Sequence, residues 1–210
     1  MKNACTIYLV RHGESEANIK GLFGMDTSLT NNGKEQANNL ATSLKNIHFD
    51  AVFSSPLERA KQTADIIALE RRIAVETKEL LRERNWGSID GKQKEEVRRD
   101  LHELFEKAKH LSTEERFKYK VVPDMESEEE MMGRYITALR EIAIAYTNKN
   151  VLIVSHQTIM RTFLMHIGYA TYTELPEGSI QNSGYIKLLS DGIEFEVVET
   201  KGVVKKDSWF

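Results

Sequence analysis

Short apolar runs alternate along this chain with longer stretches of helical periodicity, and this alternation constrains the fold more than any other feature. The runs are rich in β-branched and aromatic residues and are too short for helices; they cover residues 5–10 (CTIYLV), 50–55 (DAVFSS) and 150–156 (NVLIVSH). Apolar residues at helical spacing cover residues 33–44, 57–69, 128–146 and 157–167. Strands buried on both faces that alternate with helices predict βαβ units. We therefore expect an α/β fold, a three-layer sandwich with a mainly parallel central sheet.

Two segments depart from this alternation. The runs GYIKLLS and IEFEVVE are joined by Asp191 and Gly192, a pair typical of β-hairpin turns, so one edge of the sheet is expected to be antiparallel. Residues 92–123 are dense in charge and carry only a thin apolar stripe, which predicts a small helical cap insertion. A chain of 210 residues can bury about 70% of its unfolded surface as one domain. We expect a single domain over residues 1–210, with the cap at 92–123.

Composition argues against several classes of protein. A formal net charge of -3 predicts no nucleic-acid partner, and the apolar runs are too short to span a bilayer, so no membrane partner is expected. The segment MKNACTIYLVRHGE is not expected to be a signal peptide, because charge directly follows its short apolar stretch. The single cysteine, Cys5, cannot form an internal disulfide, which fits a cytoplasmic location. The tail with Trp209 and Phe210 is expected either to dock or to stay mobile, and a homodimer is left open.

Charged side chains follow three predicted strands at the point where each strand ends. Arg11 and His12 follow the first strand, Arg59 lies in the first turn of the helix after the second, and His156 ends the third. Ligands of open parallel sheets bind beyond the carboxyl ends of the strands. We therefore expect these four residues to meet at one rim of the sheet.

Arginines and histidines at one rim are typical of an anion pocket, and phosphate is its natural occupant. Guanidinium groups match phosphate oxygens in bidentate fashion, and the starts of the helices after the second and third strands would add backbone N–H donors. One neutral imidazole can attack phosphorus while the other stabilises the equatorial oxygens. No HxxxH or paired-Asp spacing typical of a metal cage is found, so no metal ligands are predicted and a metallophosphatase is disfavoured.

A phosphate ester also needs a proton donor for its leaving group, and a carboxyl group is the usual choice. The loop of residues 79–92 carries three carboxyl groups, those of Glu79, Glu83 and Asp90. Their spacing does not choose among them.

Several segments together resemble the histidine phosphatase superfamily, also called the phosphoglycerate-mutase-like family. The first is LVRHGES (residues 9–15), and the others follow in the family's order over nearly the whole chain: 23–37 (FGMDTSLTNNGKEQA), 54–64 (SSPLERAKQTA), 81–92 (LRERNWGSIDGK), 123–134 (PDMESEEEMMGR), 154–161 (VSHQTIMR) and 180–189 (IQNSGYIKLL). The resemblance implies phosphohistidine chemistry without a metal or another cofactor. It implies His12 as the nucleophile, Glu83 as the proton donor and a phosphate pocket of Arg11, Arg59 and His156. It also implies substrate-binding roles for Asn18, Gly24 and Gln157.

The resemblance leaves the activity open between two branches. Mutases of the family carry a longer, proline-rich segment before the second histidine, whereas this interval holds only Pro123; the stretch RERNWGSIDGKQK is nevertheless close to the mutase form. Gln157 stands where glycine usually follows the histidine, and Phe23 where phosphatases often carry a polar residue. We favour a phosphatase acting on a small phosphorylated metabolite, with a cofactor-dependent phosphoglycerate mutase as the alternative and a non-catalytic phosphate-binding regulator third. Basic cap residues such as Lys94 and Arg98 either face the pocket and favour a second anionic group or are simply solvated.

Overall fold

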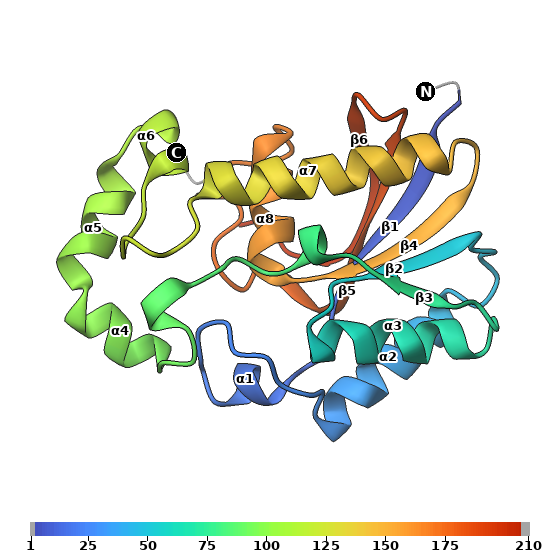
Figure 1. Cartoon of the computed structure of the whole chain (residues 1–210), viewed down its shortest axis with the longest axis horizontal. Coiled ribbons are helices and arrows are strands. Elements are labelled where there is room, and N and C mark those ends of the chain that lie inside the picture. The colour runs from blue at the N-terminus through green and yellow to red at the C-terminus, as the bar shows by residue number, and fades with distance from the viewer. Residues whose placement is uncertain (1–2, 207–210) are drawn as a thin grey trace.

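The computed structural model describes residues 3–206, which form one mixed six-stranded sheet between two layers of helices (Figure 1). Residues 1–2 and 207–210, with Trp209 and Phe210 among them, lie outside the described residues. The strand order is β3-β2-β4-β1-β5-β6. The parallel strands are β1 (Cys5–Arg11), β2 (Ala51–Ser54), β3 (Val75–Thr77) and β4 (Asn150–Ser155), and the antiparallel pair is β5 (Ile180–Ser190) and β6 (Phe195–Val203). The predicted α/β fold with a mainly parallel sheet and an antiparallel edge hairpin is confirmed.

The sheet is buried on both faces, as continuous apolar strands require. In β1, Ile7 and Leu9 pack into one core, while Tyr8 and Val10 pack into the other. Successive side chains of a strand point to opposite faces, so a short run of apolar residues supplies both cores. Two helices, α7 (Glu128–Ala145) and α8 (Gln157–His166), cover the first face, and α2 (Asn31–Ser43) and α3 (Glu58–Leu69) cover the second (Figure 1).

The four long helices begin at recognisable caps or directly after strands. Thr30 caps the N-terminus of α2 by accepting a hydrogen bond from the Gly33 N–H at 2.9 Å, and Ser127 and Glu130 form a capping box at α7. The bounds of all four helices lie within two residues of the predicted ones. The short elements α1 (Glu16–Ile19) and β3 were not predicted.

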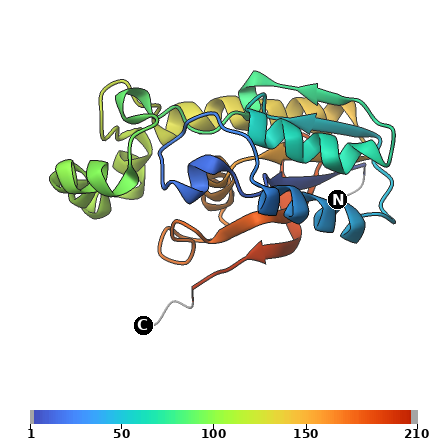
Figure 2. The ribbon, with the colours of Figure 1, turned by 90° about the horizontal axis from the view of Figure 1, so that it is seen from below.

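Residues 92–123 fold into three short helices that project beyond one end of the sheet (Figure 1 and Figure 2). These are α4 (Lys94–Asp100), α5 (His102–His110) and α6 (Thr113–Lys118). A third apolar cluster joins them to the loops beside the sheet: Phe23, Ile89, Val97, Val121 and Met125. Two single-turn 3-10 helices, η1 (Glu79–Leu81) and η2 (Gly87–Ile89), flank the loop that carries Glu83. Within residues 3–206, no helix is both long and apolar enough to cross a membrane.

Candidate active site

Two parallel strands at the centre of the sheet bring the two histidines together. β1 pairs with β4 so that Arg11 lies opposite Ser155, and His12 and His156 follow directly after these residues. The His12 N–H donates to the Ser155 carbonyl at 3.1 Å, and the centroids of the two imidazole rings lie 5.1 Å apart. The ends of separate strands therefore meet at one rim, as the sequence predicted.

The hydrogen bonds of the His12 ring assign its proton to Nδ1. Arg59, in the first turn of α3, donates from Nε to His12 Nε2 at 3.1 Å. A guanidinium group has no acceptor, so Nε2 must offer its lone pair. His12 Nδ1 then donates its hydrogen to the Gly13 carbonyl at 2.6 Å. This tautomer leaves at Nε2 the lone pair that a nucleophilic imidazole requires.

Burial keeps both imidazoles neutral. The exposed fraction is 3% for His12 and 0% for His156. Loss of solvation lowers the pKa of His12 well below its ordinary value of 6.5, and the charges of Arg59 and Arg11 lower it further. Burial, followed by the charge of Arg59, lowers the pKa of His156 in the same direction. Burial also lowers the pKa of Arg11 to about 10, so this guanidinium still carries its charge at neutral pH.

Two nitrogen atoms of the site are buried without a partner among residues 3–206. Arg11 donates from Nη1 to the Ile180 carbonyl at 2.6 Å, but its Nε has no acceptor. His156 Nε2 lies 2.7 Å from the Ser55 hydroxyl, and its Nδ1 has no partner. Buried polar groups are almost always hydrogen-bonded, so such atoms are typical of a site whose ligand completes the set.

Glu83 reaches the same site from the loop after η1 and binds the start of α8. Its Oε1 accepts hydrogen bonds from the backbone N–H of Ile159 at 3.1 Å and of Arg84 at 2.9 Å, and its Oε2 accepts from Thr158 at 3.0 Å. The sequence analysis expected the first N–H groups of this helix to face phosphate. Two of them, those of Thr158 and Ile159, bind the Glu83 carboxylate, a favourable partner for the positive dipole end of the helix.

The first turn of α3 has a similar contact. The N–H of its first residue, Glu58, donates to Asp26 Oδ1 at 2.8 Å. Both helix starts therefore share part of their N–H groups with a carboxylate of the chain, and their use by phosphate stays a prediction.

The structure separates the three carboxyl groups that the sequence left open. Glu83 lines the main cavity. Glu79 is exposed and pairs with Arg82 at 3.3 Å, and Asp90 accepts a hydrogen bond from the Met25 N–H at 3.2 Å. Neither of these two carboxyl groups lines the cavity.

A cavity of about 830 Å³ opens beside the two histidines. Seven of the eight predicted site residues line it: Arg11, His12, Asn18, Gly24, Arg59, Glu83 and Gln157. The eighth, His156, is fully buried next to His12. The structure thus brings all eight residues together around one space.

Two of the lining residues have a local geometric reason to be there. Gly24 has a φ of +55°, and a Cβ at this position would lie 1.6 Å from Asp90 Oδ1, so a larger residue would be strained and would force Asp90 to move. Asn18 uses its Oδ1 to accept from the Ser15 N–H at 3.1 Å and from Asn182 Nδ2 at 3.2 Å. Because Oδ1 binds both Ser15 and Asn182, the amide nitrogen Nδ2 of Asn18 points away from these two residues.

Asn182 was missed by the sequence analysis. Besides contacting Asn18, its Nδ2 lies 3.2 Å from the His12 carbonyl, to which it donates. It is the third residue of β5 and lies within the family-like segment 180–189, but nothing in that segment singles it out from the other polar residues there.

A group of cations in the outer part of the cavity was also missed. Arg84, Arg116 and Arg161 line the cavity near Tyr172, whose hydroxyl donates to Glu128. The Arg116 guanidinium carbon lies 3.9 Å from the centre of the Tyr172 ring. The cap residues Lys94 and Arg98 also line the cavity, but both pair with Glu177. These three guanidinium groups line the cavity together with carboxylates, of which Glu128 acts on both Arg84 and Arg161.

Comparison with known proteins agrees with this geometry. Residues 7–201 match the family model of the histidine phosphatase superfamily (branch 1). The uncharacterized phosphatase PhoE of Bacillus subtilis is 31% identical over 163 residues, which cover 77% of this chain and 76% of that protein. The 2,3-bisphosphoglycerate-dependent phosphoglycerate mutase of Cytophaga hutchinsonii is 35% identical over 167 residues, with coverage of 77% and 76%.

A solved structure gives the same picture of the fold. Phosphoglycerate mutase from Bacillus anthracis superposes with a TM-score of 0.84 at 24% identity, covering 96% of this chain and 94% of that one. Relatives of this chain therefore include both phosphatases and mutases.

Proposed function

This chain belongs to the histidine phosphatase superfamily (branch 1), and from this premise we propose that it is a metal-independent phosphatase that hydrolyses a small phosphate monoester through a phosphohistidine on His12. The observation that carries the proposal is the state of His12: a buried, neutral ring whose Nε2 offers its lone pair to Arg59. A histidine that only fills space in the core does not require a guanidinium group at the lone pair of its ring nitrogen.

In the first step, the Nε2 lone pair attacks phosphorus and the ester P–O bond breaks. The departing oxygen takes a proton from Glu83, so this step requires the protonated carboxyl group. Arg59 leaves Nε2 and donates to a phosphate oxygen instead. The unpartnered Arg11 Nε and His156 Nδ1 provide further hydrogen-bonding positions for the equatorial oxygens, where charge must be stabilised in the transition state.

In the second step, water attacks phosphorus and the P–N bond breaks, which returns the electron pair to His12 Nε2. The carboxylate of Glu83 takes the proton of the attacking water. The products are inorganic phosphate and the enzyme with a protonated Glu83, ready for the next ester.

The donor set supports chemistry that uses no metal ion. The two imidazoles stand beside the guanidinium groups of Arg11 and Arg59, whose positive charge repels a cation. Within the described part of the chain, no group of three or more His, Cys, Asp or Glu side chains is arranged to hold a metal. The arginines take the place that a Lewis acid would fill in stabilising charge on the transferred group.

The outer cavity supports a substrate with a second anionic group. Arg84, Arg116 and Arg161 line it, and guanidinium groups match both carboxylate and phosphate oxygens. The helices of residues 92–123, which bring Arg116 to this cavity, would act as the cap over the substrate. A phosphorylated sugar, glycerate or amino acid fits this description.

The phosphohistidine is tested by trapping it. Incubation with radiolabelled p-nitrophenyl phosphate, followed by a denaturing quench, is expected to leave a label that acid removes and base does not. His12→Ala should abolish the label, while His48→Ala, at a position where the side chain is 84% exposed, should keep it. A full label on the His12→Ala protein would refute the assignment of the nucleophile.

A phosphoglycerate mutase is the second candidate, favoured by the 35% identity to the Cytophaga hutchinsonii enzyme. A mutase returns the phosphoryl group to a bound organic acceptor, whereas a phosphatase gives it to water. With 3-phosphoglycerate and 2,3-bisphosphoglycerate, our proposal predicts phosphate release at least as fast as the formation of 2-phosphoglycerate. Isomerisation faster than release would establish the mutase. Phosphate binding without turnover of any ester in a substrate panel would instead support a non-catalytic regulator.

A further inference from the structure

The loop that presents Glu83 has no regular secondary structure of its own. Residues 82–86 belong to no helix or strand. A proton donor must nevertheless be held close to its productive position, because a displacement of about 1 Å can cost 10²-fold in rate. Something outside the loop must therefore fix it in place.

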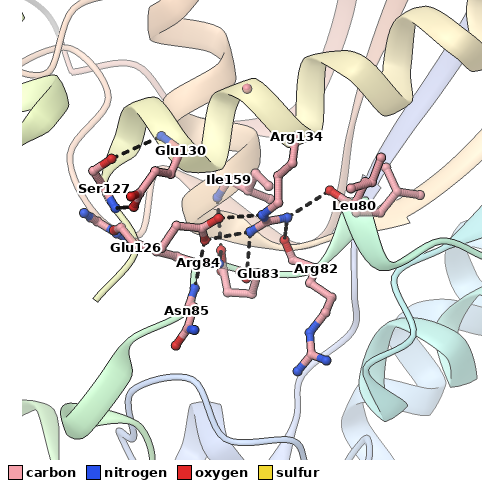
Figure 3. Close-up of polar contacts among 12 residues, drawn as sticks. Leu80, Arg82, Glu83, Arg84, Asn85, Glu126, Ser127, Glu130, Arg134 and Ile159 are labelled. Carbon is pink, nitrogen blue, oxygen red and sulfur yellow. Dashed lines mark hydrogen bonds and ion pairs between the residues drawn. The ribbon is translucent and has the colours of Figure 1, made fainter. Parts of the chain in front are cut away.

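We propose that the ion pair of Arg134 and Glu126 is the positioning device that holds Glu83 for proton transfer, an inference that rests on the function proposed above. Arg134 lies on α7 and Glu126 lies just before that helix, so both come from a part of the chain distant from the loop (Figure 3). The pair is largely shielded from water, with 19% of the Arg134 side chain and 13% of the Glu126 side chain exposed.

Arg134 uses all five of its N–H donors on this loop and on Glu126. Its Nη1 donates to the carbonyls of Leu80 at 2.9 Å and Arg82 at 2.8 Å, and its Nη2 donates to the carbonyl of Glu83 at 3.1 Å. Its Nε and Nη2 bind the two carboxylate oxygens of Glu126 at 2.6 and 2.8 Å. One guanidinium group thus fixes the backbone from η1 up to the proton donor itself (Figure 3).

Glu126 fixes the other side of the donor. Its Oε2 also accepts from the Asn85 N–H at 3.0 Å, and its own backbone N–H donates to the Asn85 carbonyl at 2.9 Å. The Glu126 carbonyl accepts from Arg84 Nε at 2.7 Å. The residues immediately before and after Glu83 are therefore held by a single ion pair, which leaves the Glu83 side chain to contact α8 and the cavity.

The geometry requires a guanidinium group at this position. Lysine has three donors on a compact ammonium group and cannot match the planar, bidentate contact with Glu126 while binding three carbonyls. Arg134→Lys preserves the charge and most of the buried stem but releases the loop. This variant therefore isolates the positioning role from the charge.

The test compares two leaving groups. A nitrophenolate leaves without help from an acid, whereas an alkoxide needs the proton. For glycerol phosphate, we expect Arg134→Lys to lower kcat/KM about 10- to 100-fold, a part of the 10²–10⁴ that a general acid supplies. For p-nitrophenyl phosphate, we expect a loss of less than about 3-fold, because general-acid help is small there. The parameter kcat/KM reports phosphoenzyme formation alone, so use of Glu83 as a base in the second step does not enter.

Three further variants make the result decisive. Arg140→Lys, on the same helix but with its side chain donating to the Ile193 carbonyl at 3.2 Å rather than to the loop, should leave turnover of both substrates unchanged. Glu126→Gln keeps the size of the side chain but loses the charged carboxylate that binds Arg134. It should show the same selective loss, and it serves as the test if Arg134→Lys does not fold. Glu83→Gln removes the proposed proton donor itself, so its selective loss of kcat/KM for glycerol phosphate is the upper limit for the other variants.

The outcomes separate this inference from the proposed function. Selective loss in Arg134→Lys or Glu126→Gln supports positioning of the acid. Equal losses for both esters in these variants, with Glu83→Gln still selective, overturn the positioning role and leave the proposed function intact. If Glu83→Gln lowers kcat/KM equally for glycerol phosphate and p-nitrophenyl phosphate, Glu83 is not the proton donor. The assignment in the proposed function and the positioning inference then both fail.

Discussion

The two buried histidines should make the stability of this protein depend on pH between about 7 and 5. The pKa of each ring is lowered well below its ordinary value of 6.5, because burial and the neighbouring guanidinium groups oppose protonation of His12 and His156 in the folded state. In the unfolded chain both rings take up protons as the pH falls through 6.5. The unfolded state then binds more protons than the folded state, so the free energy of unfolding decreases with falling pH.

The size of this effect follows from the linkage relation. A histidine that titrates at 6.5 in the unfolded chain and stays neutral in the folded one costs about 1.2 kcal/mol of stability between pH 7.0 and 5.5. Two such residues, His12 and His156, cost about 2.5 kcal/mol together. This is a large part of the roughly 5–15 kcal/mol that a domain of ordinary stability has.

Urea unfolding at pH 7.0 and 5.5 measures the difference directly. In the double variant His12→Gln/His156→Gln, most of the decrease in the free energy of unfolding between pH 7.0 and 5.5 should disappear. In each single variant about half of that decrease should remain. His48→Gln, at an exposed position, serves as the control and should behave like the unsubstituted protein. The reasoning fails if the double variant loses as much stability as the unsubstituted protein over this range.

The geometry of the site supports three further predictions. Glu83→Gln should lower the free energy of unfolding by about 1–3 kcal/mol in urea, because its amide nitrogen cannot accept the Thr158 N–H; an unchanged value would show that this contact contributes little. Gly24→Ala should destabilise more than Gly21→Ala in the same measurement: both have positive φ, but a Cβ at Gly24 meets Asp90 at 1.6 Å and one at Gly21 meets nothing closer than 3.8 Å. Turnover should survive exhaustive EDTA treatment and be inhibited by vanadate, which mimics the pentacoordinate phosphorus; activity lost to EDTA and restored by a metal would contradict the mechanism.

The fold could be predicted from the sequence where local pattern and tertiary environment agree. The strands β1 and β4 are apolar on both faces because each lies inside the sheet, so a continuous apolar run identifies them. The strand Val75–Thr77 has three residues, of which only Val75 is apolar, and its position at the edge follows from pairing with β2. No local pattern marks so short a strand.

The site could be predicted in part, for a related reason. The end of a parallel strand is a position in space as well as in the sequence, so the sequence alone is enough to place Arg11, His12 and His156 together. The choice among the carboxyl groups of the loop depends on which one meets the N-terminus of α8. That contact is a property of the folded chain, and for Glu83 only the family resemblance indicated it.

In the mechanism proposed above, Arg59 would link substrate binding to activation of the nucleophile. In the structure its Nε donates to the lone pair of His12 Nε2, which keeps that nitrogen unprotonated and directed towards a cation. A phosphate dianion entering the pocket is a stronger acceptor than a neutral ring, so we expect the same donor to move to a phosphate oxygen. Its departure would free the lone pair as phosphorus arrives beside it. Glu83 and Asp26 already bind the N–H groups of Thr158, Ile159 and Glu58 at the two helix starts. In the proposed mechanism the guanidinium groups would therefore be the main attraction for the anion, and Arg59 would have to release His12 in order to bind it.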